Sequence, residues 1–143
     1  MTSFLVCDDH GLMRDALVQM LSGLFPGAHI VAARDYPSAF AHLSEPFDLC
    51  ITDFVMPGCE PMSGIRQFIA LQPSMPVIVI SGQSDRATIN GLIGLNIAGI
   101  IPKTLDAKIV EAAINLVLAG GRYLPPEVVS FASPEKADAS DNL

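Results

Sequence analysis

The sequence predicts an α/β fold, in which a doubly wound sheet of five parallel strands is covered by helices on both faces. Short apolar segments rich in Val and Ile alternate five times with longer segments of helical periodicity. Three of the short segments are apolar throughout, which is typical of strands buried between two helical layers. Strict alternation with short loops indicates right-handed crossovers within a single sheet.

The expected strands are four or five residues long at most. They cover residues 4–7, 29–33, 49–52, 77–80 and 99–101. Proline cannot donate to a strand ladder, so the fifth strand should end at Pro102 or lie at an edge. The second strand ends near Arg34 without a group that matches the ends of the others, so we expect it at the far edge of the sheet.

Five amphipathic segments separate and follow these strands. We expect helices at about 12–24, from about 35, and at about 63–71, 85–95 and 106–119. The stripes that should face the core contain Met13, Leu17, Met20 and Leu24, widened by Leu12, Ala16 and Leu21, in the first helix, and Ile109, Val110, Ala113, Ile114 and Val117 in the last. The fourth helix carries Gly91 and Gly94, each costing roughly 1 kcal/mol relative to Ala, so it should be the least stable.

Length, composition and cysteine content indicate a single globular domain in a reducing compartment. The 143 residues carry a net charge of −7, which argues against a body that grips nucleic acid through its phosphates. No apolar run is long enough to span a bilayer, and no basic region precedes the first strand as in a secretory signal. The three cysteines fit free thiols in the cytoplasm, with a redox role for Cys59 left open. Residues 1–121 should form the domain, and residues 122–143 a linker or tail.

Reactive side chains follow four of the five predicted strands. Asp8 and Asp9 follow the first, Asp53 the third, Ser81 the fourth and Lys103 the fifth. In an open parallel sheet these ends share one edge, where ligands bind. The sequence therefore predicts a common site there. The three histidines are not at metal-ligand spacing, and we expect them to be ordinary surface or half-buried residues.

Three carboxylates at one site repel each other unless a cation shares the site. An all-oxygen ligand set with few protein ligands suits Mg²⁺, and Lys103 adds a second, compact positive charge. A carboxylate between two cations is a poor proton acceptor but a competent nucleophile toward phosphorus. The Ser81 hydroxyl would donate to a phosphoryl oxygen.

These motifs resemble the receiver domains of two-component response regulators. The resemblance covers about the first 120 residues through Asp8-Asp9, Asp53-Phe-Val-Met-Pro-Gly58, Ser81 and Lys103, in family order and spacing. The segment Ala119-Gly-Gly-Arg-Tyr-Leu-Pro-Pro-Glu-Val128 further resembles the NarL/FixJ subfamily. The resemblance implies a flavodoxin-like (βα)5 fold with strand order 2-1-3-4-5. It also implies a DNA-binding helix-turn-helix domain after the linker, outside this chain.

Residue by residue, the resemblance implies a phosphorylation switch. Asp53 would accept the phosphoryl group from a sensor histidine kinase or a phosphotransfer protein, with no catalysis beyond its own phosphotransfer and dephosphorylation. Asp9 and Asp53 would bind Mg²⁺ directly, Asp8 through water, and Val55 through its backbone carbonyl. Ser81 and Lys103 would contact the phosphoryl group. The resemblance also implies that the protein can form a homodimer. DNA would be bound only through the further domain, and no membrane partner is expected.

Three features depart from the family pattern. Ile100 stands where receivers carry an aromatic residue whose rotamer follows the phosphorylation state. Three residues around Cys59-Glu60-Pro61 appear as an insertion, so that Gly64 matches the family glycine. Pro102 precedes Lys103, whereas many receivers place proline after the lysine, and the isomer of the Ile101–Pro102 bond stays open.

Other functions remain open at this point. A receiver that works only as a dimerisation module, without phosphate, is favoured by Ile100 and opposed by the intact acid cluster. A phosphatase of the haloacid dehalogenase type needs a second Asp two residues after the nucleophile, and Val55 stands there instead. A flavodoxin-like cofactor domain needs a Gly- or Ser/Thr-rich phosphate loop after the first strand, which this sequence lacks.

Overall fold

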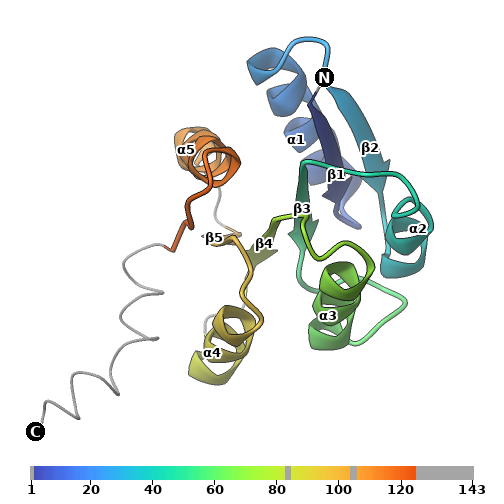
Figure 1. The fold of residues 1–143 in the computed structure, drawn as a ribbon, viewed down its shortest axis with the longest axis vertical. Helices are drawn as coiled ribbons and strands as arrows, with labels where there is room; N and C mark the ends of the chain where they lie inside the picture. The colour runs from blue at the N-terminus through green and yellow to red at the C-terminus, as the bar shows by residue number, and fades with distance from the viewer. Residues whose placement is uncertain (1, 83–84, 104–105, 125–143) are drawn as a thin grey trace, which may run out of the picture.

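A computed structural model describes residues 2–82, 85–103 and 106–124 and confirms the predicted fold (Figure 1). The strands are β1 (Ser3–Cys7), β2 (His29–Ala33), β3 (Leu49–Asp53), β4 (Val77–Ser81) and β5 (Gly99–Pro102). All pairings between neighbours are parallel, and the order is β2-β1-β3-β4-β5. The edge positions expected for the second and fifth strands are therefore confirmed, and the Ile101–Pro102 peptide bond is trans.

Two helical layers cover the sheet. The helices are α1 (Gly11–Leu24), α2 (Tyr36–Ala41), α3 (Pro61–Leu71), α4 (Arg86–Gly94) and α5 (Ala107–Leu118). One apolar cluster joins alternate strand residues such as Val6 and Ile51 to α1 and α5, and the other joins Leu5 and Cys50 to α2, α3 and α4. This division is visible in Figure 1, where α1 and α5 lie on one side of the strands and the other three helices on the opposite side.

Several local expectations need correction. Leu12 was placed in the core stripe of the first helix, but it is 88% exposed, because at 3.6 residues per turn it lies on the side of α1 opposite the buried Leu17 and Leu21. Ile109 of α5 is likewise 40% exposed. The third helix begins at Pro61, two residues earlier than predicted, because the Glu60 carboxylate caps it by accepting from the backbone N–H groups of Met62 and Ser63.

The described helices are all short. The longest of them, α1, has 14 residues, well below the roughly 20 that a helix needs to cross a bilayer. None of the helices in the described ranges is long and apolar enough to cross a membrane.

Candidate functional site

The parallel sheet brings three of the predicted side chains together at the ends of β1, β3 and β5. The ammonium Nζ of Lys103 lies 2.5 Å from Oδ2 of Asp53 and 3.9 Å from Oδ2 of Asp8. Asp53 is only 3% exposed and Asp8 is fully buried. The contact between Asp53 and Lys103 joins residues 50 positions apart, and it forms because both strands end at the same edge.

Asp8 places an acceptor in the site that has no donor. Its Oδ1 accepts from the backbone N–H of His10 at 2.9 Å, but its Oδ2 is buried and has no hydrogen-bond partner among the described residues. A buried oxygen left in this way costs about 1–3 kcal/mol. Carboxylate oxygens are the ligands that Mg²⁺ prefers, so the donor set fits a divalent cation held between Asp8, Asp9 and Asp53.

The charge of Asp53 is disfavoured when no further cation is present. Burial of the carboxylate raises the pKa of Asp53, and the hydrogen bond from Lys103 acts against that shift. Repulsion from Asp8 and Asp9 raises the pKa further. A divalent cation at the site would reverse this balance, because it stabilises the ionised, nucleophilic carboxylate.

His10 lies beside the same cluster, and it is a surface residue as expected, with 64% of its side chain exposed. Its Nδ1 lies 3.1 Å from Oδ1 of Asp8, 3.3 Å from Oδ1 of Asp9 and 3.8 Å from Oδ2 of Asp53. These four residues place ligand atoms within 4.8 Å of one another. The available signal was its position directly after two site carboxylates, whereas the spacing between histidines carried no information.

For Ser81 and Val55, the structure gives the position of each residue but not the contacts that were predicted for it. Ser81 is buried at the end of β4, and its carbonyl accepts from the backbone N–H of Lys103 at 3.0 Å. Val55 lies in the loop after β3 with an exposed side chain. The contacts predicted for the Ser81 hydroxyl and the Val55 carbonyl stay predictions.

A buried tyrosine that the sequence analysis missed holds the loop after Asp53. The hydroxyl of Tyr36, in α2, donates to the carbonyl of Phe54 at 2.6 Å, and burial raises the pKa of Tyr36, so the hydroxyl remains a donor. Its ring lies against Gly64 of α3, where a Cβ atom would overlap it. The signal was Gly64, whose match to the family glycine marks a close approach.

A five-stranded parallel sheet with this acid and lysine edge defines a class of signalling domain, and the sequence comparison identifies it. The profile described as "Response regulator receiver domain" matches residues 4–115. The chain belongs to the response regulator receiver family.

Particular relatives support this assignment. The chain is 29% identical over 131 residues to the "Glycerol metabolism activator" of Pseudomonas putida, covering 90% of this chain and 59% of that protein. It is 25% identical to a LuxR family DNA-binding response regulator from Silicibacter pomeroyi, with a TM-score of 0.74 and coverage of 90% and 99%. The isolated REC domain of RcsB from Salmonella enterica serovar Typhimurium has the same fold, with a TM-score of 0.81 at 21% identity and coverage of 91% and 97%. The chain spans about 60% of the length of the first two curated relatives.

Proposed function

We propose that this chain is a Mg²⁺-dependent phosphorylation switch in which Asp53 accepts the phosphoryl group of a sensor histidine kinase or a phosphotransfer protein. The observation that carries the proposal is the ion pair of the buried Asp53 with the half-buried Lys103, beside Oδ2 of Asp8, which accepts no hydrogen bond from the described residues. A site of this kind holds one carboxylate ready as a nucleophile and leaves room for a cation next to it.

The proposed transfer uses the residues of the chain as follows. An oxygen of Asp53 attacks the phosphorus of a phosphohistidine, the P–N bond breaks, and the imidazole of the donor leaves. Lys103 holds the carboxylate and then pairs with a phosphoryl oxygen, to which the Ser81 hydroxyl donates. Asp8, Asp9, Asp53 and the Val55 carbonyl would hold Mg²⁺, which when bound neutralises the phosphoryl oxygens.

The surface next to the site supports docking of a protein donor. A shallow apolar hollow of about 370 Å³ opens beside Lys103 and is lined by His10, Leu12, Met13 and Ala16. Leu12 is 88% exposed within this hollow, and a contiguous exposed apolar patch of this kind is typical of a contact surface. Docking there would place a phosphohistidine next to Asp53.

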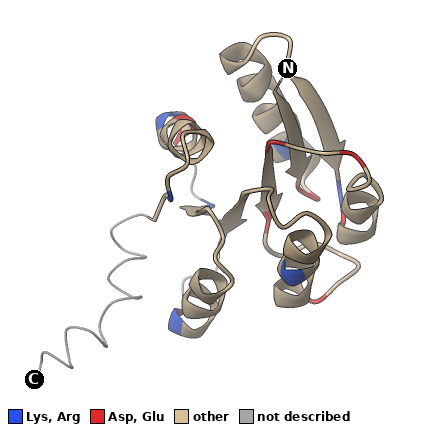
Figure 2. Ribbon diagram, viewed as in Figure 1, with Lys and Arg blue, Asp and Glu red and all other residues tan. Residues whose placement is uncertain are grey.

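The proposed output is control of transcription. The relatives include a protein named as a DNA-binding response regulator and one named as an activator of metabolism. Because the described Lys and Arg residues are scattered over separate elements rather than gathered on one face (Figure 2), DNA binding would belong to a helix-turn-helix domain reached through residues 122–143. We propose cytoplasmic location and a homodimer as the active assembly.

Incubation with acetyl phosphate tests the phosphoacceptor directly. Wild-type protein with Mg²⁺ should gain the mass of one phosphoryl group, and the Asp53→Asn variant should not. Asp15→Asn, at an exposed position on α1, is the matched control and should be labelled like the wild type. Equal labelling of Asp53→Asn would refute the proposal, and failure to label the wild type would favour the alternative, a phosphate-independent dimerisation module.

A further inference from the structure

The strand that carries the site lysine also contacts the segment after α5. Lys103 follows the end of β5, and its backbone N–H donates to the carbonyl of Ser81. At the other end of the same four-residue strand, Tyr123 forms a parallel bridge with Gly99. A short edge strand therefore connects the proposed phosphorylation site with the last described residues of the chain.

The pairing of Tyr123 is specific to this edge. Its backbone N–H donates to the Ala98 carbonyl at 2.9 Å, and its carbonyl accepts from the Ile100 N–H at 3.1 Å. A Cβ atom at position 99 would lie 3.2 Å from the Tyr123 carbonyl oxygen, so glycine gives the two backbones room to approach. Ile100, which replaces the family's aromatic residue, is thus bonded directly to the segment that leaves the domain.

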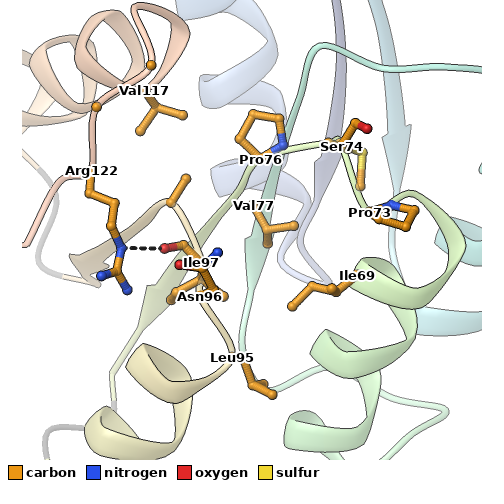
Figure 3. Close-up of a pocket in the computed structure, with 14 residues that line it drawn as sticks. Ile69, Pro73, Ser74, Pro76, Val77, Leu95, Asn96, Ile97, Val117 and Arg122 are labelled. Atoms are coloured by element: carbon orange, nitrogen blue, oxygen red, sulfur yellow. Dashed lines mark hydrogen bonds between the residues drawn. The ribbon is translucent and has the colours of Figure 1, made fainter.

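Arg122 ties the same segment to the end of α4. Its Nε donates to the Ile97 carbonyl at 3.0 Å, as Figure 3 shows, and its terminal nitrogen lies 3.4 Å from the Ile93 carbonyl. Ile93 is in the last turn of α4, where a positive charge is favourable, and its carbonyl also accepts from the backbone N–H of Asn96 at 3.0 Å. The guanidinium lines a hollow of about 470 Å³ between the ends of α3, α4 and α5.

We propose that residues 121–124, which we name the C-terminal latch, dock on β5 and α4 in the unphosphorylated protein and are released when Asp53 is phosphorylated. The inference rests on the proposed function. Lys103 contacts the Asp53 carboxylate in the unphosphorylated protein, so a phosphoryl group added to Asp53 would have to move Lys103 and, with it, the end of β5, the strand that follows α4. Because Arg122 binds the carbonyl of Ile93 in α4 and that of Ile97 in the loop before β5, a displacement of α4 relative to β5 would break one of these contacts. Coupling between the phosphorylation site and the latch requires an element that can adopt two arrangements. In this proposal that element is α4, which contains Gly91 and Gly94.

Amide hydrogen exchange of the full chain, followed by NMR, tests the latch at two atoms. The amides of Ile100 and Tyr123 should exchange about fivefold faster with acetyl phosphate and Mg²⁺ than without them, the factor for one net hydrogen bond of about 1 kcal/mol. In the Arg122→Gln variant, the same two amides should exchange about fivefold faster than in the wild type before phosphorylation. Phosphorylation should then change their exchange rates little. Arg66→Gln, at an exposed position on α3, is the control and should behave as the wild type.

A second variant and a mass measurement separate the possible failures. Tyr123→Pro removes the donor to Ala98 while retaining the Arg122 side chain, and should also speed exchange at Ile100. Unchanged or slower exchange in phosphorylated wild type overturns the latch, as does an Arg122→Gln protein that responds fully. Intact mass on each sample reports whether Asp53 was labelled. A protein that is not labelled refutes the phosphorylation switch, and with it the release step, while the unphosphorylated variants still report on docking.

Discussion

At Asp53, burial and charge act in opposite directions. The buried carboxylate is held by Lys103 at 2.5 Å, yet its pKa lies above the usual value because desolvation outweighs that contact. The two other acids at the site add to the shift. The ionised carboxylate of Asp53 is therefore destabilised by its surroundings, and a bound cation or the transfer of a phosphoryl group would remove that destabilisation.

The raised pKa of Asp53 predicts how stability depends on pH when EDTA removes divalent cations. An acid whose pKa is higher in the folded state stabilises folding below its unfolded pKa of about 3.9, and that contribution is lost as pH rises through the folded pKa. Thermal unfolding should therefore show the Asp53→Asn variant gaining stability relative to wild type between about pH 4 and pH 7. A relative loss over that range would mean that Lys103 dominates and the pKa is lowered.

Gly64 controls the position of the loop that follows Asp53. A methyl group there would overlap the Tyr36 ring, which is buried and fixed by its hydrogen bond to Phe54. Gly64→Ala should lower the free energy of unfolding by about 1–3 kcal/mol, as overpacking does, measured by urea denaturation. Gly23→Ala, on α1 with open space at the Cβ position, is the control. Equal stability of the Gly64 variant and the wild type would contradict this account.

At the residue scale, the site residues that could be predicted from the sequence are those that directly follow a strand. Asp8, Asp53 and Lys103 were found because parallel strands end at one edge. The contact of His10 with the acids was not predicted, because it depends on the turn after β1, where the backbone N–H of His10 donates to Asp8 and the ring lies next to the carboxylates. Tyr36 lies on a different element from its partner, so no local pattern could have indicated it.

Among the elements, α4 is expected to have weak helical stabilisation of its own, because Gly91 and Gly94 lie within it. It has nine residues, begins at the Asp85 cap and buries only Ile89 and Leu92. The same helix ends where Arg122 of the C-terminal latch binds its carbonyl. Any displacement of α4 would therefore move Ile89 and Leu92 within the core as well as the carbonyl that Arg122 binds.

Two glycine-to-alanine variants in α4 should change the free energy of unfolding by different amounts. A Cβ at Gly94 meets nothing within 4 Å, whereas one at Gly91 would lie 2.9 Å from Cε of Met62. Gly94→Ala should therefore stabilise the protein by up to about 1 kcal/mol, and Gly91→Ala by less because Met62 must move. Chemical denaturation of both variants measures the difference. A larger gain at Gly91 would show that helix propensity alone decides.

Element boundaries were predicted well where capping chemistry was familiar. The Asp caps of α2, α4 and α5 lie where the sequence placed helix starts. The start of α3 was missed because glutamate is an uncommon cap, and the extra residues of the loop supply it. Leu12 and Ile109 were wrongly assigned to the core because an apolar stripe seen in sequence is wider than the face a sheet can cover.

At the scale of the whole molecule, the strand order could be predicted because it follows from family resemblance and from the two edge strands. The docking of residues 122–124 on β5 could not, since a single tyrosine bridge leaves no periodic signal in the sequence. The core, by contrast, follows from five apolar strands that any parallel arrangement must bury on both faces.

The account depends on one claim, that the folded chain makes residue 53 the phosphoryl acceptor in a Mg²⁺-loaded pocket. Borohydride reduction of acetyl phosphate-treated protein converts an aspartyl phosphate into homoserine, and peptide mass spectrometry then locates it. We expect homoserine at position 53 alone, with none in EDTA. Homoserine at another aspartate, or a signal at 53 that EDTA leaves unchanged, would contradict the account.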